Sequence, residues 1–104
     1  MAEKRNMSTN KVTIFYLNNC PYCHSAKKAV EELKSNDAAY QAVDIEWIEE
    51  SRNPEIADRF DYYYVPSVFN GEEKLYECSP ADVYSTIRNN IKKALDSVIK
   101  LAEG

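Results

Sequence analysis

The sequence lacks long hydrophobic runs, an excess of positive charge and internal repeats. No apolar segment approaches the roughly 20 residues that a helix needs to span a bilayer, and the polar residues 1–10 lack the apolar region of a secretion signal. The 104 residues include 13 lysines and arginines against 17 acidic residues, and the net charge of −4 argues against an electrostatic nucleic-acid interface. We therefore expect a single cytoplasmic domain that binds neither a membrane nor nucleic acid.

Cysteine and histidine are also scarce, with three cysteines and one histidine. An odd number of cysteines in a cytoplasmic protein argues against a framework of structural disulfides. Cys20, Cys23, His24 and Cys78 carry soft metal ligands, but a structural zinc site normally draws on two clustered pairs, and the second pair is missing. The pattern Cys-x-x-Cys-His also fits c-type haem attachment, which would require export. Redox chemistry is the favoured interpretation, and two small buried core residues are the structural alternative.

The two close cysteines lie between a predicted strand and a predicted helix. Residues 12–17 form an almost continuous apolar run, typical of a central strand that is buried on both faces. After the cysteines, apolar residues recur at spacings of three and four up to Leu33, which predicts a helix ending near residues 35–37. Cysteines in this context are typical of a redox pair.

This placement gives each residue of the motif a physical task. If Cys20 caps the helix, its sulfur faces unpaired backbone N–H groups and the positive end of the helix dipole, which favour the thiolate. Pro21 suits the first helical position, because its missing N–H would be unpaired there anyway. Cys23 lies one turn further along and can resolve a mixed disulfide formed on Cys20.

The remaining chain predicts two more helices and three more strands. A short second strand is expected around residues 40–46, and Asn53-Pro54-Glu55 predicts the start of a helix whose buried residues are Ile56, Ala57 and Phe60. Residues 64–69 predict a strand entered through a proline, Asn70-Gly71 a tight hairpin turn, and residues 74–76 the returning strand. Ser79-Pro80 predicts the start of a long helix with a buried stripe at helical spacing: Val83, Ile87, Ile91, Leu95 and Val98.

The sequence Cys-Pro-Tyr-Cys resembles the active site of dithiol glutaredoxins, and the resemblance extends to residues 12–16 before it and Ala26-Lys27 after it. The order β-α-β-α-β-β-α over residues 11–100 is similar to the thioredoxin fold, and residues 53–60 followed by Pro66-Ser67 resemble the second half of thioredoxin. The resemblance implies an α/β thioredoxin fold: a four-stranded mixed sheet with helices on both faces. It implies one domain over residues 11–104, after a loose leader at residues 1–10.

In function, the resemblance implies a thiol–disulfide oxidoreductase in which Cys20 is the nucleophile and Cys23 the resolving thiol. It implies a cis bond before Pro66, which packs beside the cysteines, and backbone contacts from Val65 to a bound peptide; an ordinary trans proline is the alternative. Pro21 and Tyr22 are expected to contact substrate. No bound cofactor or metal is expected, only a reversible Cys20–Cys23 disulfide with glutathione as a candidate co-substrate. The Pro-Tyr spacer disfavours the iron–sulfur cluster that some glutaredoxin relatives bind.

The expected partners are disulfide-containing proteins or small thiols, together with thioredoxin reductase or the glutathione system, and the protein is expected to be a monomer.

The chain departs from the glutathione-binding pattern of glutaredoxins, because Leu17 replaces a basic residue, Tyr64 replaces a threonine and residues 76–79 replace a Gly-Gly-acid sequence. Ile14 stands where thioredoxin has a buried acid. We therefore expect a disulfide reductase without tight glutathione dependence, and the alternatives are a glutathione-dependent glutaredoxin or a non-catalytic metal- or peptide-binding module.

Two smaller expectations concern residues outside the motif. Cys78 is expected to be a small apolar filler. Glu46, Glu49 and Glu50 are expected to face water in a solvated connection that Trp47 anchors.

Overall fold

The computed structural model describes residues 11–103, with side chains described up to residue 101. The leader expected at residues 1–10 lies outside the described residues. Four strands form one sheet in the order β2-β1-β3-β4, and their bounds are β1 (Lys11–Tyr16), β2 (Asp44–Glu49), β3 (Ser67–Asn70) and β4 (Glu73–Glu77). Strand β1 pairs parallel with β2 and antiparallel with β3, and β3 pairs antiparallel with β4. The expected four-stranded mixed sheet is confirmed.

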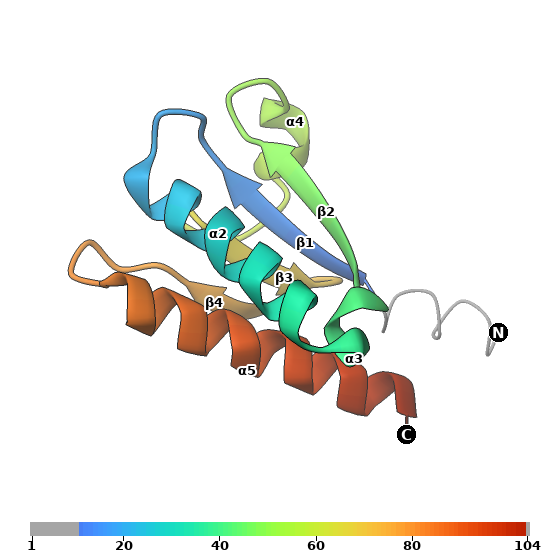
Figure 1. The fold of residues 1–104 in the computed structure, drawn as a ribbon. Helices are drawn as coiled ribbons and strands as arrows, with labels where there is room; N and C mark the ends of the chain where they lie inside the picture. Colours follow the sequence, from blue (N-terminus) through green and yellow to red (C-terminus); the bar gives the residue numbers. More distant parts are fainter. Residues whose placement is uncertain (1–10, 104) are drawn as a thin grey trace, which may run out of the picture.

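Helices cover both faces of this sheet. Helices α2 (Pro21–Asn36) and α5 (Tyr84–Glu103) pack side by side over one face, where Val12 and Ile14 of β1 belong to their core (Figure 1). On the other face, Phe15 packs against short helix α4 (Pro54–Ala57) and the segment that follows it. Strand β1 is therefore buried on both sides, as its continuous apolar run predicted. No helix within residues 11–103 is long and apolar enough to cross a membrane.

The second strand lies later in the chain than expected. Residues 38–41 form a helical turn, α3 (Ala38–Gln41), in which Asp37 caps the N-terminus by accepting a hydrogen bond from the backbone N–H of Ala39 (2.9 Å). Tyr40 is buried in the core as part of this turn, not of a strand. The stretch around Trp47, expected to be a solvated connection, is instead part of β2. The N-cap hydrogen bond of Asp37 stabilises a helical turn here, where the weak alternation of apolar residues had indicated a strand.

Strand β3 and the last helix also begin later than predicted, whereas β4 begins one residue earlier. Residues 64–66 are irregular, so β3 begins only at Ser67. The hairpin turn consists of Gly71 and Glu72, because Asn70 already pairs with Glu73. Gly71 has φ +61°, and glycine with positive φ at the first turn position is typical of a type II′ hairpin.

Helix α5 begins at Tyr84, not at Ser79-Pro80. Residues 79–82 form a separate turn, in which the backbone N–H of Asp82 donates to the carbonyl oxygen of Ser79 (2.9 Å). Val83 was expected in the buried stripe but is 61% exposed. The rest of the stripe is buried as predicted: Ile87, Ile91, Leu95 and Val98.

Candidate functional site

The two close cysteines lie at the start of α2, where β1 ends (Figure 1). Cys20 is the N-cap, and its sulfur accepts a hydrogen bond from the backbone N–H of Cys23 at 3.3 Å. The carbonyl oxygen of Cys20 also accepts the first two helical hydrogen bonds, from the N–H groups of Cys23 and His24 (3.0 and 3.1 Å). Exposed Pro21 occupies the first helical position, where no N–H is needed.

The environments of the two thiols differ. Cys20 is partly exposed, whereas Cys23 has no exposed surface. Burial is the main cause that raises the pKa of the Cys23 thiol far above its ordinary value, and its hydrogen bond with Cys20 raises it further. The arrangement therefore keeps Cys23 protonated while the sulfur of Cys20 is accessible to another molecule.

The segment before β3 lies beside Cys20. The bond between Val65 and Pro66 is cis, as the resemblance implied, and Pro66 is fully buried. The thiol of Cys20 donates to the carbonyl oxygen of Val65 at 3.7 Å. The structure thus brings Cys20 together with Val65 and Pro66, which follow it in the sequence by 45 residues or more.

The third cysteine lies behind this segment. The backbone N–H of Cys78 donates to the carbonyl oxygen of Pro66 (3.0 Å), and its thiol donates to the carbonyl oxygen of Ser79 (3.5 Å). The side chain is 2% exposed, and burial is the main cause that raises its pKa. This agrees with the expectation of a small buried filler.

Tyr22 and His24, the residues on either side of Cys23, each bind a backbone carbonyl group in a different loop. The hydroxyl of Tyr22 donates to the carbonyl oxygen of Pro80, which ties α2 to the turn before α5. The Nε2 of His24 donates to the carbonyl oxygen of Asn18 (2.8 Å). Within the described part of the chain, no three histidine, cysteine, aspartate or glutamate residues are grouped so that they could hold a metal ion.

The site also includes Glu49, which the sequence analysis placed wrongly in water. This residue ends β2 and is 8% exposed. Its carboxylate accepts hydrogen bonds from the hydroxyl of Ser51 and from the backbone N–H groups of Asn18 (3.2 Å) and Arg52 (3.1 Å). The bond from Ser51 is the main cause that holds the pKa of Glu49 below its ordinary value. A signal was available, since an acid followed by serine and other polar residues at a strand end is typical of a carboxylate that caps a turn.

Glu49 borders an open, mostly polar hollow of about 400 Å³ beside Cys20. Its lining includes residues 17–19, which lead to the cysteine, and the turn residues Ser51 and Arg52. The carboxylate joins the two sides, because it binds the backbone of Asn18 on one and of Arg52 on the other. Glu49 therefore fixes the loop between β1 and Cys20.

Comparisons with known proteins agree with this architecture. Residues 12–74, more than half of the chain, match the family model described as Glutaredoxin. A curated thioredoxin from Methanocaldococcus jannaschii is 37% identical over 67 residues, which are 64% of this chain and 76% of the relative. The chain belongs to the glutaredoxin/thioredoxin family. Membership of this family supports, in general terms, activity as a thiol–disulfide oxidoreductase.

Solved structures with lower identity show the fold. Thioredoxin 1 from Thermosipho africanus TCF52B superimposes with a TM-score of 0.55 at 22% identity, covering 83% of this chain and 94% of that one. A designed protein gives a TM-score of 0.56 at 22% identity, covering 91% of this chain and 86% of that one. The thioredoxin fold expected from the element order is confirmed. The glutaredoxin match ends at residue 74, before the stretch 76–79 in which the sequence departs from glutaredoxins.

Proposed function

We propose that this glutaredoxin-family chain reduces disulfides by dithiol exchange, with Cys20 as the nucleophile and Cys23 as the resolving thiol. The observation that carries the proposal is the asymmetry of the two sulfurs at the start of α2. The sulfur of Cys20 is accessible and receives a backbone N–H bond, which a thiolate accepts more strongly than a thiol does. Cys23 is buried and protonated at the start of the reaction.

In the proposed first step, the Cys20 thiolate attacks one sulfur of the substrate disulfide. A bond forms between Cys20 and that sulfur, the substrate S–S bond breaks, and the second substrate sulfur leaves as a thiolate that takes a proton from water. In the second step, Cys23 loses its proton to water or to the substrate thiolate released in the first step, and its own thiolate attacks the sulfur of Cys20. The mixed disulfide breaks, the remaining substrate thiol leaves, and the Cys20–Cys23 disulfide holds the two oxidising equivalents.

A further turnover needs an external two-electron thiol donor, and we propose either the dithiol of a flavoprotein such as thioredoxin reductase or glutathione. Tight use of glutathione is disfavoured because Leu17, Tyr64 and residues 76–79 replace the basic residue, the threonine and the glycines of the glutaredoxin pattern. Side chains in place of glycines obstruct the close approach of a ligand to the backbone. Disulfide-bearing substrates and a cytoplasmic setting belong to the same proposal.

The cysteine roles are tested with three variants of the reduced protein. Cys20→Ser is expected to abolish reduction of a model disulfide, because the nucleophile is lost. Cys23→Ser is expected to accumulate a mixed disulfide with the substrate, detectable by mass spectrometry under non-reducing conditions. Cys78→Ala removes the third thiol and is the matched control, which retains turnover. Reduction by Cys20→Ser at the wild-type rate would contradict the proposal.

The electron donor is tested by NADPH-coupled assays of the wild-type protein. One assay supplies thioredoxin reductase, and the other supplies glutathione with glutathione reductase. We expect faster turnover in the first. Efficient turnover with glutathione would contradict the weak dependence on glutathione and leave the dithiol mechanism intact. No turnover in either assay would contradict both supplied donors, and failure of the prereduced protein to reduce the disulfide in a single turnover would contradict the mechanism itself.

A further inference from the structure

Two consecutive tyrosines project into solvent from the segment that leads to the contact with Cys20. Tyr63 is 94% exposed and Tyr64 is 52% exposed, and their ring centroids are 6.5 Å apart. Tyr64 directly precedes Val65, whose carbonyl oxygen accepts the hydrogen bond from the Cys20 thiol. The two rings therefore form an exposed aromatic surface on the segment whose next residue, Val65, contacts the atom at which a substrate disulfide would be attacked.

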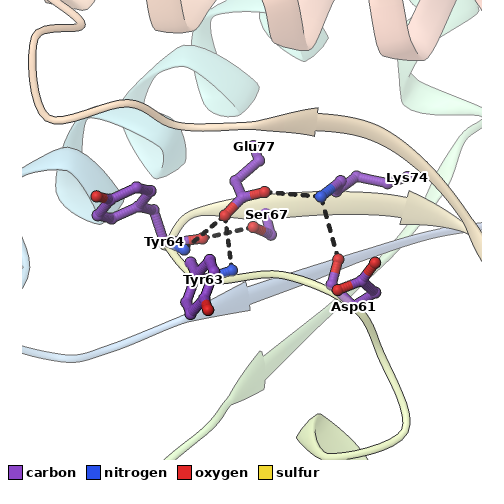
Figure 2. Close-up of polar contacts among 6 residues, drawn as sticks. All are labelled: Asp61, Tyr63, Tyr64, Ser67, Lys74 and Glu77. Atoms are coloured by element: carbon purple, nitrogen blue, oxygen red, sulfur yellow. Dashed lines mark hydrogen bonds and ion pairs between the residues drawn. The ribbon is translucent and has the colours of Figure 1, made fainter.

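The backbone that carries these rings is held by two side chains of strand β4. One carboxylate oxygen of Glu77 accepts hydrogen bonds from the backbone N–H groups of both Tyr63 and Tyr64, each at 2.7 Å (Figure 2). The other oxygen pairs with the ammonium group of Lys74 at 2.7 Å. The same ammonium group donates to the carbonyl oxygen of Asp61 at 3.1 Å. Lys74 and Glu77 thus fix the backbone at three points between residues 61 and 64.

The hydroxyl of Ser67 closes the other side of this loop by donating to the carbonyl oxygen of Tyr64. Ser67 is fully buried, and Figure 2 shows its side chain and that of Glu77 meeting the loop at the same turn. Charge-assisted hydrogen bonds to a carboxylate are stronger than neutral ones. The loop is therefore ordered by polar contacts to its backbone, while the two exposed rings remain free to contact another molecule.

An ordered loop with exposed tyrosines is suited to recognition. Tyrosine offers a large, amphipathic contact area at a low cost in side-chain entropy, and a backbone that is already fixed lowers the ordering cost of binding. A chain in extended conformation advances about 3.3 Å per residue. Since Tyr64 is one residue from the carbonyl group beside Cys20, it would face a substrate residue one or two positions from the attacked cysteine.

We propose that Tyr63 and Tyr64 select polypeptide disulfides that carry an apolar side chain within two residues of the attacked cysteine, and that Glu77 is the positioning residue that holds them there. This inference rests on the proposed disulfide reductase activity and names its substrate class. A small symmetric disulfide has no side chain that reaches the two rings. A polypeptide with leucine or phenylalanine at that position buries apolar area against them.

The test uses the reduced full-length protein in single turnovers, which need no electron donor. Two short peptides, identical except for leucine or serine on both sides of one cysteine, are each linked by a disulfide to a chromogenic thiol whose release is followed. Wild type is expected to prefer the leucine peptide by roughly tenfold, the effect of about one favourable aromatic contact. Tyr63→Ser/Tyr64→Ser is expected to lose most of this preference. Leu101→Ser removes an exposed apolar side chain of α5 and is the matched control, which keeps the preference.

The role of Glu77 is tested by separating binding from the limiting rate. Glu77→Ala is expected to raise the half-saturating concentration of the leucine peptide severalfold and to affect the limiting rate less. Glu77→Gln is expected to restore part of the affinity, because its amide oxygen still accepts the backbone N–H bonds. Glu73→Ala, an exposed acid of the same strand, is the matched control. Equal loss of limiting rate on both peptides would show a structural role and contradict positioning.

The outcomes separate the two proposals. Equal rates of wild type on the leucine and serine peptides would overturn the inference and leave the reductase activity standing. No thiol release from either peptide by wild type would overturn the proposed function itself. A preference that survives in Tyr63→Ser/Tyr64→Ser would assign the selection to other residues and overturn the role of the rings.

Discussion

The rings of Phe15, Phe60, Tyr62 and Phe69 form an aromatic cluster. We expect its contribution to stability to depend on ring geometry more than on side-chain volume, and Phe15→Leu tests this. Phe15 has no exposed surface. Its ring centroid lies 4.8 Å from that of Phe60, 4.9 Å from that of Tyr62 and 5.8 Å from that of Phe69. Phe60 and Tyr62 belong to the segment that leads to Pro66. The cluster therefore joins the centre of the sheet to the loop beside Cys20.

Leucine keeps most of the apolar area of Phe15 but forms no ring contact. An aromatic pair contributes about 0.5–1.5 kcal/mol beyond its buried area. Three such contacts that share one ring are not fully additive, so we expect a loss of about 2 kcal/mol in the free energy of unfolding. A small domain has a total of about 5–15 kcal/mol, so the variant should still fold. The melting temperature should fall by about 10 °C.

The assay is urea unfolding of wild type, Phe15→Leu and the control Ile14→Leu. Ile14 is equally buried but faces α2 and α5, and a swap between isomers usually costs less than about 1.5 kcal/mol. A double-mutant cycle with Phe60→Leu should give a coupling energy of about 1 kcal/mol. If Phe15→Leu costs no more than Ile14→Leu, or the cycle shows no coupling, the reasoning from ring geometry is wrong.

Two further predictions concern Glu49 and Gly71. Hydrogen bonds hold the pKa of Glu49 below its ordinary 4.5 in the folded protein, so its stabilisation is complete above that value and is lost as the pH falls through the lower folded pKa. The difference in unfolding free energy between wild type and Glu49→Gln should therefore shrink between neutral pH and about pH 3, and a constant difference would contradict the role of the charge. Gly71→Ala should lower stability by about 1 kcal/mol through its φ of +61° alone, since a Cβ there meets nothing within 4 Å, and Gly71→Asn should cost less in the same urea titration.

Strand β1 and helix α2 were predictable because their signals are local and agree with one another. The apolar run of residues 12–17 needs burial on both sides, and a central strand between two helical layers supplies it. For α2, the cap by Cys20, the proline at the first position and the apolar spacing all indicate the same start. The close approach of Cys23 to the sulfur of Cys20 followed from the same local geometry.

Strand β2 was harder to predict because its aromatic residue is covered by a charged side chain. The ammonium group of Lys27 lies 4.1 Å from the ring centroid of Tyr16 and 5.5 Å from that of Trp47. These contacts join α2 to both strands. In sequence the strand looks polar because three of its six residues are acidic. The late start of α5 has a similar cause, since the carboxylate of Asp82 accepts from the backbone N–H of Ser79 (3.0 Å) and closes a turn where the sequence signals predicted a helix.

The long-range contacts of the acids that organise the site could not be recognised from their sequence neighbours, because Asn18 and residues 63 and 64 lie in other loops. Strands β1, β2 and β4 all end at the same edge of the sheet, since β2 is parallel to β1 and β4 reaches the same direction through two antiparallel pairings. Glu49 is the last residue of β2 and Glu77 the last of β4. Glu49 accepts a backbone N–H bond from Asn18 in the loop before Cys20, and Glu77 accepts two from residues 63 and 64 in the loop before Pro66.

The carboxylates at the strand ends are also related to the low glycine content of the chain. The chain has only two glycines, and Gly71 lies in the hairpin turn away from the loops beside Cys20. Those loops therefore reach their positions without glycine, and carboxylates at the strand ends hold their backbones instead. Hydrogen bonds to Glu49, and hydrogen bonds and the ammonium group of Lys74 at Glu77, offset the charges of these two carboxylates and keep them bound to the loops.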